Sequence, residues 1–217
     1  MTHNDKIGTA TMIETFTRRQ ILIAGGAFAG LATLGLPAAA ETREIVEMTL
    51  GDPDAPVTVI EYASLTCPHC ATFHREVLPR LKEEYIETGQ VHFISREVFF
   101  DRPGLWGAML ARCAGEDRYF GMLDLLYAQQ ATWSRLDDPA TVVEHLYSIG
   151  RQAGMTRETM DACLQDADFA QALVAWYQEN ATEHGIQSTP SFVINGERTG
   201  NLPWAEFRAR IEAELAS

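Results

Sequence analysis

Apolar and polar residues alternate along several short stretches of the chain, a pattern typical of β-strands. These stretches cover residues 44–50, 57–63, 91–98 and 191–195. The segment GDPDAP separates the first two, and Asn195-Gly196 favours a tight hairpin turn into a short fifth strand. We therefore expect a sheet of about five strands.

Apolar residues recur at helical spacing in most of the remaining chain. The first such segment follows Cys67 and ends at Gly89, and Pro79 is expected to kink it. A last helix is expected over residues 202–216. Further helices are expected over residues 104–115, 118–130, 139–154, 156–166 and 169–185.

The third and fourth predicted strands are about 90 residues apart in the sequence, whereas a complete βαβ crossover needs only about 30. The additional residues indicate an insertion made of the five helices above. The expected organisation is an α/β domain formed by residues 41–97 and 185–217, with a helical insertion domain at 98–184.

The first forty residues have a different pattern. Arg18-Arg19 precede an apolar segment rich in Gly and Ala at residues 21–36, which is shorter than the about 20 residues that a bilayer span needs. Small residues follow at 38–40, so residues 1–40 are expected to be a signal peptide cleaved after Ala40. The paired arginines favour twin-arginine export to the periplasm. A Sec signal or an uncleaved anchor stays open.

The composition narrows the possible partners. The chain has 217 residues, 46% of them hydrophobic, and a formal net charge of −13. An acidic protein is a poor ligand for nucleic acid or for anionic membrane surfaces, so neither is expected as a partner. All four cysteines follow residue 40, where export to an oxidising compartment would permit disulfides.

Two of these cysteines form the motif Cys67-Pro68-His69-Cys70 at the end of a predicted strand. Proline favours the first helical position, so Cys67 is expected to be the N-cap. The backbone N–H groups of His69 and Cys70, the helix dipole and the His69 ring would then lower the pKa of the Cys67 thiol. A stabilised thiolate makes the corresponding disulfide a stronger oxidant. A zinc site or an inert bridge is the alternative for this spacing.

The motif stands in a wider context. A strand that ends in CPHC, a helical insertion, Thr189-Pro190 before another strand and the Asn195-Gly196 hairpin together resemble the thioredoxin superfamily, and within it the DsbA family of exported thiol oxidases. The resemblance implies an α/β thioredoxin-like fold, with a central mixed sheet and an inserted all-helical domain.

The resemblance also implies roles for individual residues. Cys67 would be the exposed nucleophile and Cys70 the buried resolving thiol. Pro190 would be a cis-proline beside the disulfide, and Thr189 would offer backbone hydrogen bonds to an extended substrate. Threonine stands where the best-known DsbA proteins have valine, and in this respect the chain is similar to disulfide isomerases. The substrate preference could differ accordingly.

Glu61 stands where related folds keep a buried acid that assists proton movement to the resolving thiol. A solvent-facing carboxylate is the alternative. DsbA-type proteins often pair this acid with a lysine on the neighbouring strand, but the third predicted strand has only His92 and Arg96 as basic residues, which puts the proton relay in doubt. His74, one helical turn after Cys70, is expected to face solvent.

The other two cysteines, Cys113 and Cys163, lie in predicted helices of the insertion. The resemblance implies that they form a structural disulfide. Two reduced cysteines in the core are the alternative.

The sequence thus predicts a periplasmic protein-disulfide oxidase that acts on folding exported proteins with free thiols. By resemblance, a quinone-linked membrane oxidoreductase of the DsbB type would reoxidise it. We expect a monomer with no cofactor and no metal. The alternatives are a disulfide isomerase or reductase of the same superfamily, and a metal-delivery protein that binds its ion through the CxxC motif.

Overall fold

The computed structural model describes residues 43–217. The predicted signal peptide at residues 1–40, with Arg18-Arg19 and the cleavage site after Ala40, lies outside the described residues. Among residues 43–217, no helix has both the length and the apolar character needed to cross a membrane.

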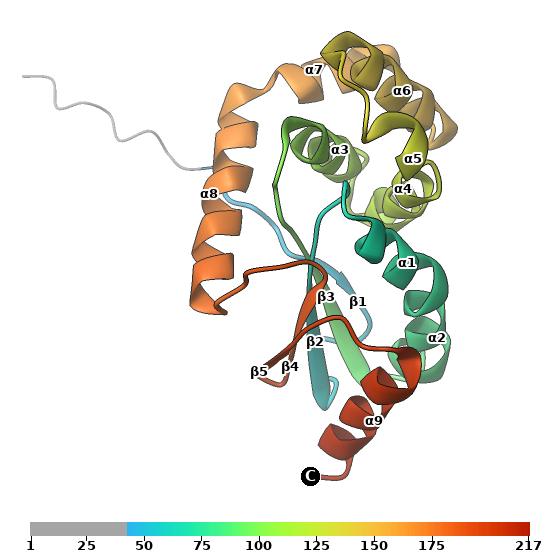
Figure 1. Ribbon diagram of the computed structural model, residues 1–217, viewed down its shortest axis with the longest axis vertical. Coiled ribbons are helices and arrows are strands. Elements are labelled where there is room, and N and C mark those ends of the chain that lie inside the picture. The colour runs from blue at the N-terminus through green and yellow to red at the C-terminus, as the bar shows by residue number, and fades with distance from the viewer. Residues whose placement is uncertain (1–42) are drawn as a thin grey trace, which may run out of the picture. The chain divides into compact units, whose positions relative to one another are not determined.

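A single mixed sheet forms the centre of the described chain, with the strand order β1-β3-β2-β4-β5 (Figure 1). Its strands are β1 (Met48–Leu50), β2 (Val57–Ala63), β3 (Val91–Glu97), β4 (Ser191–Ile194) and β5 (Glu197–Thr199). The central strand β2 pairs in parallel with β3 and antiparallel with β4. The predicted fold class, a mixed sheet of about five strands with helices around it, is confirmed.

Local interactions determine where β1 begins and where β4 ends. The first strand was predicted to begin at residue 44, but pairing with β3 begins only at Met48. The preceding Glu47 uses its carboxylate to bind Arg96, with Nη2 2.6 Å from Oε1. At the other edge, Asn195 and Gly196 have φ values of 45° and 88°. These left-handed conformations make the tight turn that the Asn-Gly pair predicted.

The helices follow in three groups. Helices α1 (Pro68–Glu76) and α2 (Leu78–Leu81) and the π-helical turn η1 (Lys82–Ile86) lie between β2 and β3. The segment between β3 and β4 contains α3 (Arg102–Cys113), α4 (Glu116–Ala128), α5 (Gln130–Trp133), α6 (Pro139–Gln152), α7 (Arg157–Gln165) and α8 (Ala167–Glu183). Helix α9 (Trp204–Leu215) follows β5.

The predicted kink in the first helix lies earlier than expected. The interruption is at Val77, between α1 and α2, two residues before Pro79. A proline in a helix has no N–H to donate, and its ring displaces the carbonyl four residues earlier, here that of Arg75. The distortion therefore spreads over the turn that precedes the proline.

Helices cover both faces of the sheet. Helices α1, α2 and α9 lie on one face, and α8 lies on the other (Figure 1). Phe73, Leu81 and Phe207 pack on the first face against Val59 and Phe93, which point toward them from β2 and β3. Burial of such side chains, worth about 1.5–3 kcal/mol each, holds α1 rigidly against the strand that precedes it.

A buried ion pair joins the helical segment to the sheet. Arg112 of α3 makes two hydrogen bonds of 2.7 Å to the carboxylate of Glu97 at the end of β3. Its remaining nitrogen donates to the Val46 carbonyl, and the Tyr119 hydroxyl donates to Glu97. Both charged residues are buried. Every hydrogen-bonding partner is supplied, which is the condition for burying charge without a large penalty.

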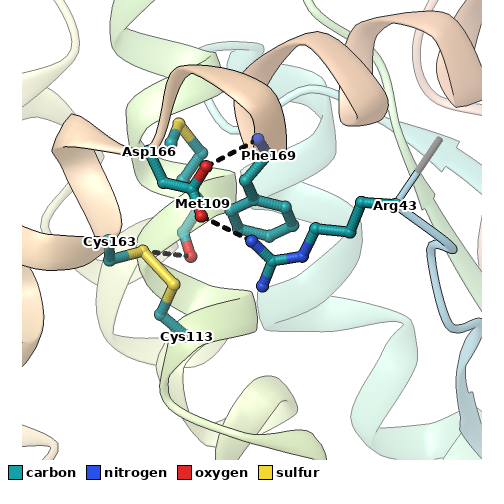
Figure 2. Close-up of a disulfide and its surroundings, with 6 residues drawn as sticks. All are labelled: Arg43, Met109, Cys113, Cys163, Asp166 and Phe169. Carbon is teal, nitrogen blue, oxygen red and sulfur yellow. Dashed lines mark hydrogen bonds and ion pairs between the residues drawn. A yellow bond between two sulfur atoms is a disulfide. The ribbon is translucent and has the colours of Figure 1, made fainter. Parts of the chain in front are cut away.

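Cys113 and Cys163 form a disulfide between the end of α3 and α7, with a Cα–Cα distance of 6.3 Å (Figure 2). The Cys163 sulfur lies 3.2 Å from the Met109 carbonyl oxygen. Nearby, the Arg43 guanidinium lies over the Phe169 ring and binds Asp166 at 2.5 Å. The beginning of the described chain is thereby fastened to α8.

Replacement of Arg112 should be costly. In Arg112→Leu, the buried Glu97 carboxylate loses its compensating charge, and we expect the free energy of unfolding to fall by about 3–5 kcal/mol. Urea denaturation measures this. The control is Arg157→Leu, which removes an exposed cation from Glu144 and Asp161 and should cost less than about 1 kcal/mol. Equal losses in the two variants would contradict the assigned role of Arg112.

Candidate active site

The CPHC motif lies where β2 passes into α1. Cys67 has extended backbone angles, φ −84° and ψ 120°, and is the N-cap of α1, with Pro68 in its first turn. The predicted position of Cys67 at the helix N-terminus is therefore confirmed. Its backbone N–H donates to the Ser64 carbonyl at 3.1 Å, which shapes the turn between strand and helix.

The two thiols of the motif have different surroundings. Cys67 is partly exposed, whereas Cys70, one turn further, is completely buried. Cys70 packs in the apolar core that includes Ala63, Leu65 and Tyr127. Only the first thiol is open to a partner in solution.

The Thr189-Pro190 loop lies beside Cys67. The peptide bond between these residues is cis. Strand β4 begins directly after Pro190 and pairs with β2, with Ser191 opposite Tyr62. The pairing brings Thr189 to the thiol across 122 positions of sequence, and the Cys67 thiol donates to the Thr189 carbonyl at 3.4 Å.

The Cys67 thiol is more acidic than an ordinary cysteine. Its pKa is lowered to about 5, chiefly because the Cys70 thiol donates a hydrogen bond to its sulfur. Thr189 and the backbone N–H groups of Cys70 and His69 add to the effect, and partial burial opposes it. The neutral thiol makes no capping hydrogen bond, since it donates to Thr189, so these N–H groups act on the thiolate. His69 itself is exposed, and its contribution comes through the backbone.

The pKa of the Cys70 thiol is shifted in the opposite direction, upward. Burial raises the pKa of the Cys70 thiol far above its ordinary value, and its hydrogen bond to Cys67 and the nearby charge of Glu61 raise it further. At neutral pH the reduced pair therefore holds a thiolate at Cys67 and a thiol at Cys70. Since the thiolate is the reactive form, nucleophilic attack falls to Cys67.

Glu61 is fully buried and points from β2 toward α1. Its Oε2 atom lies 2.9 Å from Nε2 of His74. The expectation that His74 faces solvent is wrong, because its side chain is 2% exposed. The Tyr127 ring lies against the imidazole, with ring centroids 4.3 Å apart. The inward face of α1, otherwise formed by Cys70, Ala71 and Phe73, carries this histidine.

The basic residues considered on β3 have other positions. Arg96 binds Glu47 and the Tyr62 hydroxyl. The residue opposite Glu61 on β3 is Ser95. The imidazole of His74, from the helix, thus takes the place beside Glu61 that the resemblance gives to a lysine from the strand.

Side chains of the helical segment hold the loop that carries Cys67. Gln130 donates to the carbonyls of Leu65 and Cys67, at 2.8 and 3.0 Å. Thr66 donates to Asp101 at 2.7 Å, next to the start of α3. Sequence reasoning missed Gln130, Asp101 and His74 as parts of this site, since no local pattern distinguishes them from ordinary helix and cap residues.

In the described part of the chain, no group of three or more His, Cys, Asp or Glu side chains is arranged to hold a metal ion. Cys67 and Cys70 contact each other and protein groups, as described above. What the arrangement supplies is an acidic, accessible thiol beside a buried one.

A family model described as Thioredoxin matches residues 43–213 of the chain. The chain belongs to the thioredoxin family. Among its relatives is a Rickettsia bellii protein provisionally named a protein-disulfide oxidoreductase, which is 34% identical over 78% of this chain and 64% of that protein. The chain thus spans less than two thirds of the length of this relative.

Two further proteins extend the comparison. Disulfide bond formation protein D of Bacillus subtilis is 26% identical over 76% of each chain. The crystal structure of Wolbachia pipientis alpha-DsbA1 has a TM-score of 0.71 and 29% identity, covering 80% of this chain and 92% of that one. The DsbA-like resemblance inferred from the sequence is supported by both the fold and the relatives.

The acidity of Cys67 in this thioredoxin-family protein can be measured directly. The reduced protein should show one thiolate transition near pH 5 in ultraviolet absorbance. Cys67→Ala should abolish it, because burial keeps Cys70 protonated. Cys70→Ala should raise its midpoint, because it removes the largest cause of the lowered pKa.

The same shift should make stability depend on pH. An unfolded thiol has a pKa of about 8.5, so ionisation of Cys67 stabilises the folded reduced protein above that value. The contribution is lost as the pH falls through about 5. The free energy of unfolding of the reduced protein, relative to that of Cys67→Ala, should therefore rise from pH 5 to pH 8. A flat difference would contradict the assignment.

Proposed function

We propose that the protein is an exported thiol:disulfide oxidase, which donates its Cys67–Cys70 disulfide to folding proteins with free thiols. Export through the signal in residues 1–40, by the twin-arginine route and with cleavage after Ala40, is part of the proposal. The site of action would be the periplasm, and the proposed clients are other exported proteins.

The proposal rests on the pKa values of the two thiols, because that of Cys67 is lowered and that of Cys70 is raised. A stabilised Cys67 thiolate favours the reduced pair, and by linkage makes the disulfide easier to reduce. A pKa lowered to about 5 would raise the reduction potential by on the order of 50–100 mV once solvent screening is allowed for. Such a disulfide drives the oxidation of clients.

The reaction proceeds by two exchanges. A client thiolate attacks the Cys67 sulfur, the Cys67–Cys70 bond breaks, and Cys70 leaves with the electron pair and takes up a proton. A second client thiolate then attacks the client sulfur of the mixed disulfide and releases Cys67 as a thiolate. Two electrons pass from client to enzyme, and the client leaves with a disulfide.

Thr189 and Pro190 form the proposed substrate-binding edge. The Thr189 carbonyl lies 3.4 Å from the Cys67 sulfur, so a client cysteine bonded to Cys67 would lie beside the loop. Backbone groups there could pair with an extended client segment, as an added strand does at a sheet edge. Backbone pairing tolerates many client sequences.

The remaining predicted site residues support the two cysteines. Pro68 begins the helix and His69 supplies a backbone N–H toward the thiolate. Glu61 is buried close enough to Cys70 for its charge to raise the pKa of that thiol, which fits the proposed role in proton movement.

Turnover requires that the dithiol be reoxidised. We propose a quinone-linked membrane oxidoreductase of the DsbB type, with electrons passing from the Cys67 and Cys70 thiols to cysteines of that partner. The protein would act as a monomer, without a bound organic cofactor or metal. The Cys113–Cys163 disulfide would be structural, since it lies between α3 and α7.

The reduction potential tests the proposal. We expect the Cys67/Cys70 couple to be more positive than about −200 mV, against about −270 mV for a reducing thioredoxin. Equilibration with a glutathione buffer, read by mass spectrometry of trapped thiols, measures it. A Cys113→Ala/Cys163→Ala variant should keep the same potential. A value near that of thioredoxin would instead favour a reductase.

The clients can be identified with a trapping variant. Cys70→Ala keeps the nucleophile but cannot resolve a mixed disulfide from the enzyme side, so clients should accumulate on Cys67 as adducts cleaved by reductant. Cys67→Ala is the matched control and should trap none. Adducts that appear equally in both variants would contradict the assignment of Cys67 as nucleophile.

A further inference from the structure

Proton transfer to and from the buried Cys70 thiol requires groups other than the two cysteines. Cys70 is completely buried, and burial holds its proton strongly. Each catalytic cycle must nevertheless deliver one proton to the Cys70 sulfur and later remove it. A route between this sulfur and water is therefore needed.

Glu61 and His74 form the first part of such a route. They are linked by the 2.9 Å contact between Oε2 and Nε2. The other polar atom of each group, Oε1 of Glu61 and Nδ1 of His74, is buried and has no hydrogen-bond partner among the described residues. Buried polar atoms are rarely left unpaired, because each has lost its hydrogen bonds to water without replacement. Of the three such side-chain atoms in the described residues, two lie at opposite ends of this hydrogen-bonded pair, and the third is the Ser134 hydroxyl.

The pair lies against the core that holds the buried thiol, because Tyr127 packs in that core with Cys70 and its ring lies 4.3 Å from the His74 imidazole, centroid to centroid. Burial is the largest cause that raises the pKa of Cys70 and of Tyr127, and the charge of Glu61 raises both further. On β2, Glu61 lies between Ser95 of β3 and Phe192 of β4, neither of which titrates in this range. From the sheet side, therefore, no ionisable neighbour in register with Glu61 takes its proton.

The histidine of the pair is also a lining residue of two pockets. His74 lines a pocket of about 430 Å³ and an adjoining one of about 300 Å³, and Pro79 and Asp124 line both. Residues of α1, α2 and α4 line both pockets, which we together call the groove. The charged residues along it are Arg75, Asp124, Lys82 and Glu87.

We propose that His74 is a positioning residue that passes the proton of Cys70, by way of Glu61, to and from the groove between α1 and α4. This deepens the proposed exchange reaction and rests on it. Cys67 is not among the residues that line either pocket, so the proposed route ends at residues other than the one that holds a client.

The proton balance is simple. When a client thiolate breaks the Cys67–Cys70 bond, Cys70 leaves as a thiolate, takes a proton from the Glu61–His74 pair, and water in the groove replaces that proton. During reoxidation the steps reverse. Cys70 gives its proton to the pair, attacks the Cys67 sulfur of the mixed disulfide with the oxidant, and the oxidant's thiolate leaves.

Oxidised glutathione isolates the step concerned. The Cys67 thiolate of the reduced enzyme attacks one sulfur of oxidised glutathione, forms an adduct and releases one glutathione thiolate. With oxidised glutathione in large excess, the adduct decays to the Cys67–Cys70 disulfide when Cys70 loses its proton and displaces the bound glutathione. Acid quenching followed by mass spectrometry gives the rates of adduct formation and decay separately. Only the decay reports on the proposed route.

In His74→Gln, the side chain can still hydrogen bond to Glu61 but cannot carry a proton. We expect adduct decay at pH 7 to slow by about 10-fold to 100-fold, within the range of general acid–base effects, while adduct formation changes by less than about twofold. Glu61→Gln should slow decay to a similar extent. The double variant should be no slower than either, because both act in one route.

Arg75→Gln is the matched control. Arg75 lines the same groove but is exposed and binds Glu76 and Thr72 rather than Glu61. Both of its rates should stay within about twofold of wild type. In His74→Ala, which opens space beside the groove, added imidazole should restore adduct decay.

Unchanged adduct decay in a folded His74→Gln protein would overturn the proposal and leave His74 a packing residue. If that variant fails to fold, unchanged decay in Glu61→Gln overturns it equally. The assay is separate from the reduction potential. A low potential with slowed decay would reject the oxidase and keep the route, and a high potential with unchanged decay would do the reverse.

Discussion

The structure depends on one constraint, that two cysteines three positions apart must lie in different dielectric surroundings. The N-terminus of α1 meets it. Cys67, at the N-cap, receives a hydrogen bond from Cys70 and faces backbone N–H groups, while the first helical turn carries Cys70 into the apolar core. A helix start is one of few places in a protein where so short a segment leads from a solvent-facing anion site to a dry interior.

The rest of the fold keeps this helix start in place. Packing of Phe73 and Leu81 fixes α1 on the sheet, and pairing of β4 with β2 holds Thr189 against the thiol. From the other side, Gln130 binds the carbonyls of the Cys67 loop. Arg112 and Glu97 in turn lock α3 to β3. The helical segment therefore holds the Cys67 loop in position as well as covering it.

The core contains two clusters of polar groups that differ in how completely they are hydrogen bonded. Glu61 and His74 leave two buried atoms unpaired among the described residues, whereas the Arg112–Glu97 cluster satisfies its partners fully. The two buried clusters therefore have different roles. The cluster with all its partners stabilises a junction, and the pair with unpaired atoms is the one that we propose for proton transfer to Cys70.

The sequence by itself determined what local rules govern. Alternation and turn residues predicted the strands, Pro68 predicted Cys67 as N-cap, and Asn195-Gly196 predicted the hairpin, because each depends on neighbours within a few positions. The motif combination also predicted the family. Only the tertiary structure decided that His74 turns inward to Glu61, that Gln130 holds the Cys67 loop, and that Arg112 meets Glu97. A helical face has no fixed inside until something packs on it, and these contacts join residues 13 to 63 positions apart, beyond the reach of any local pattern.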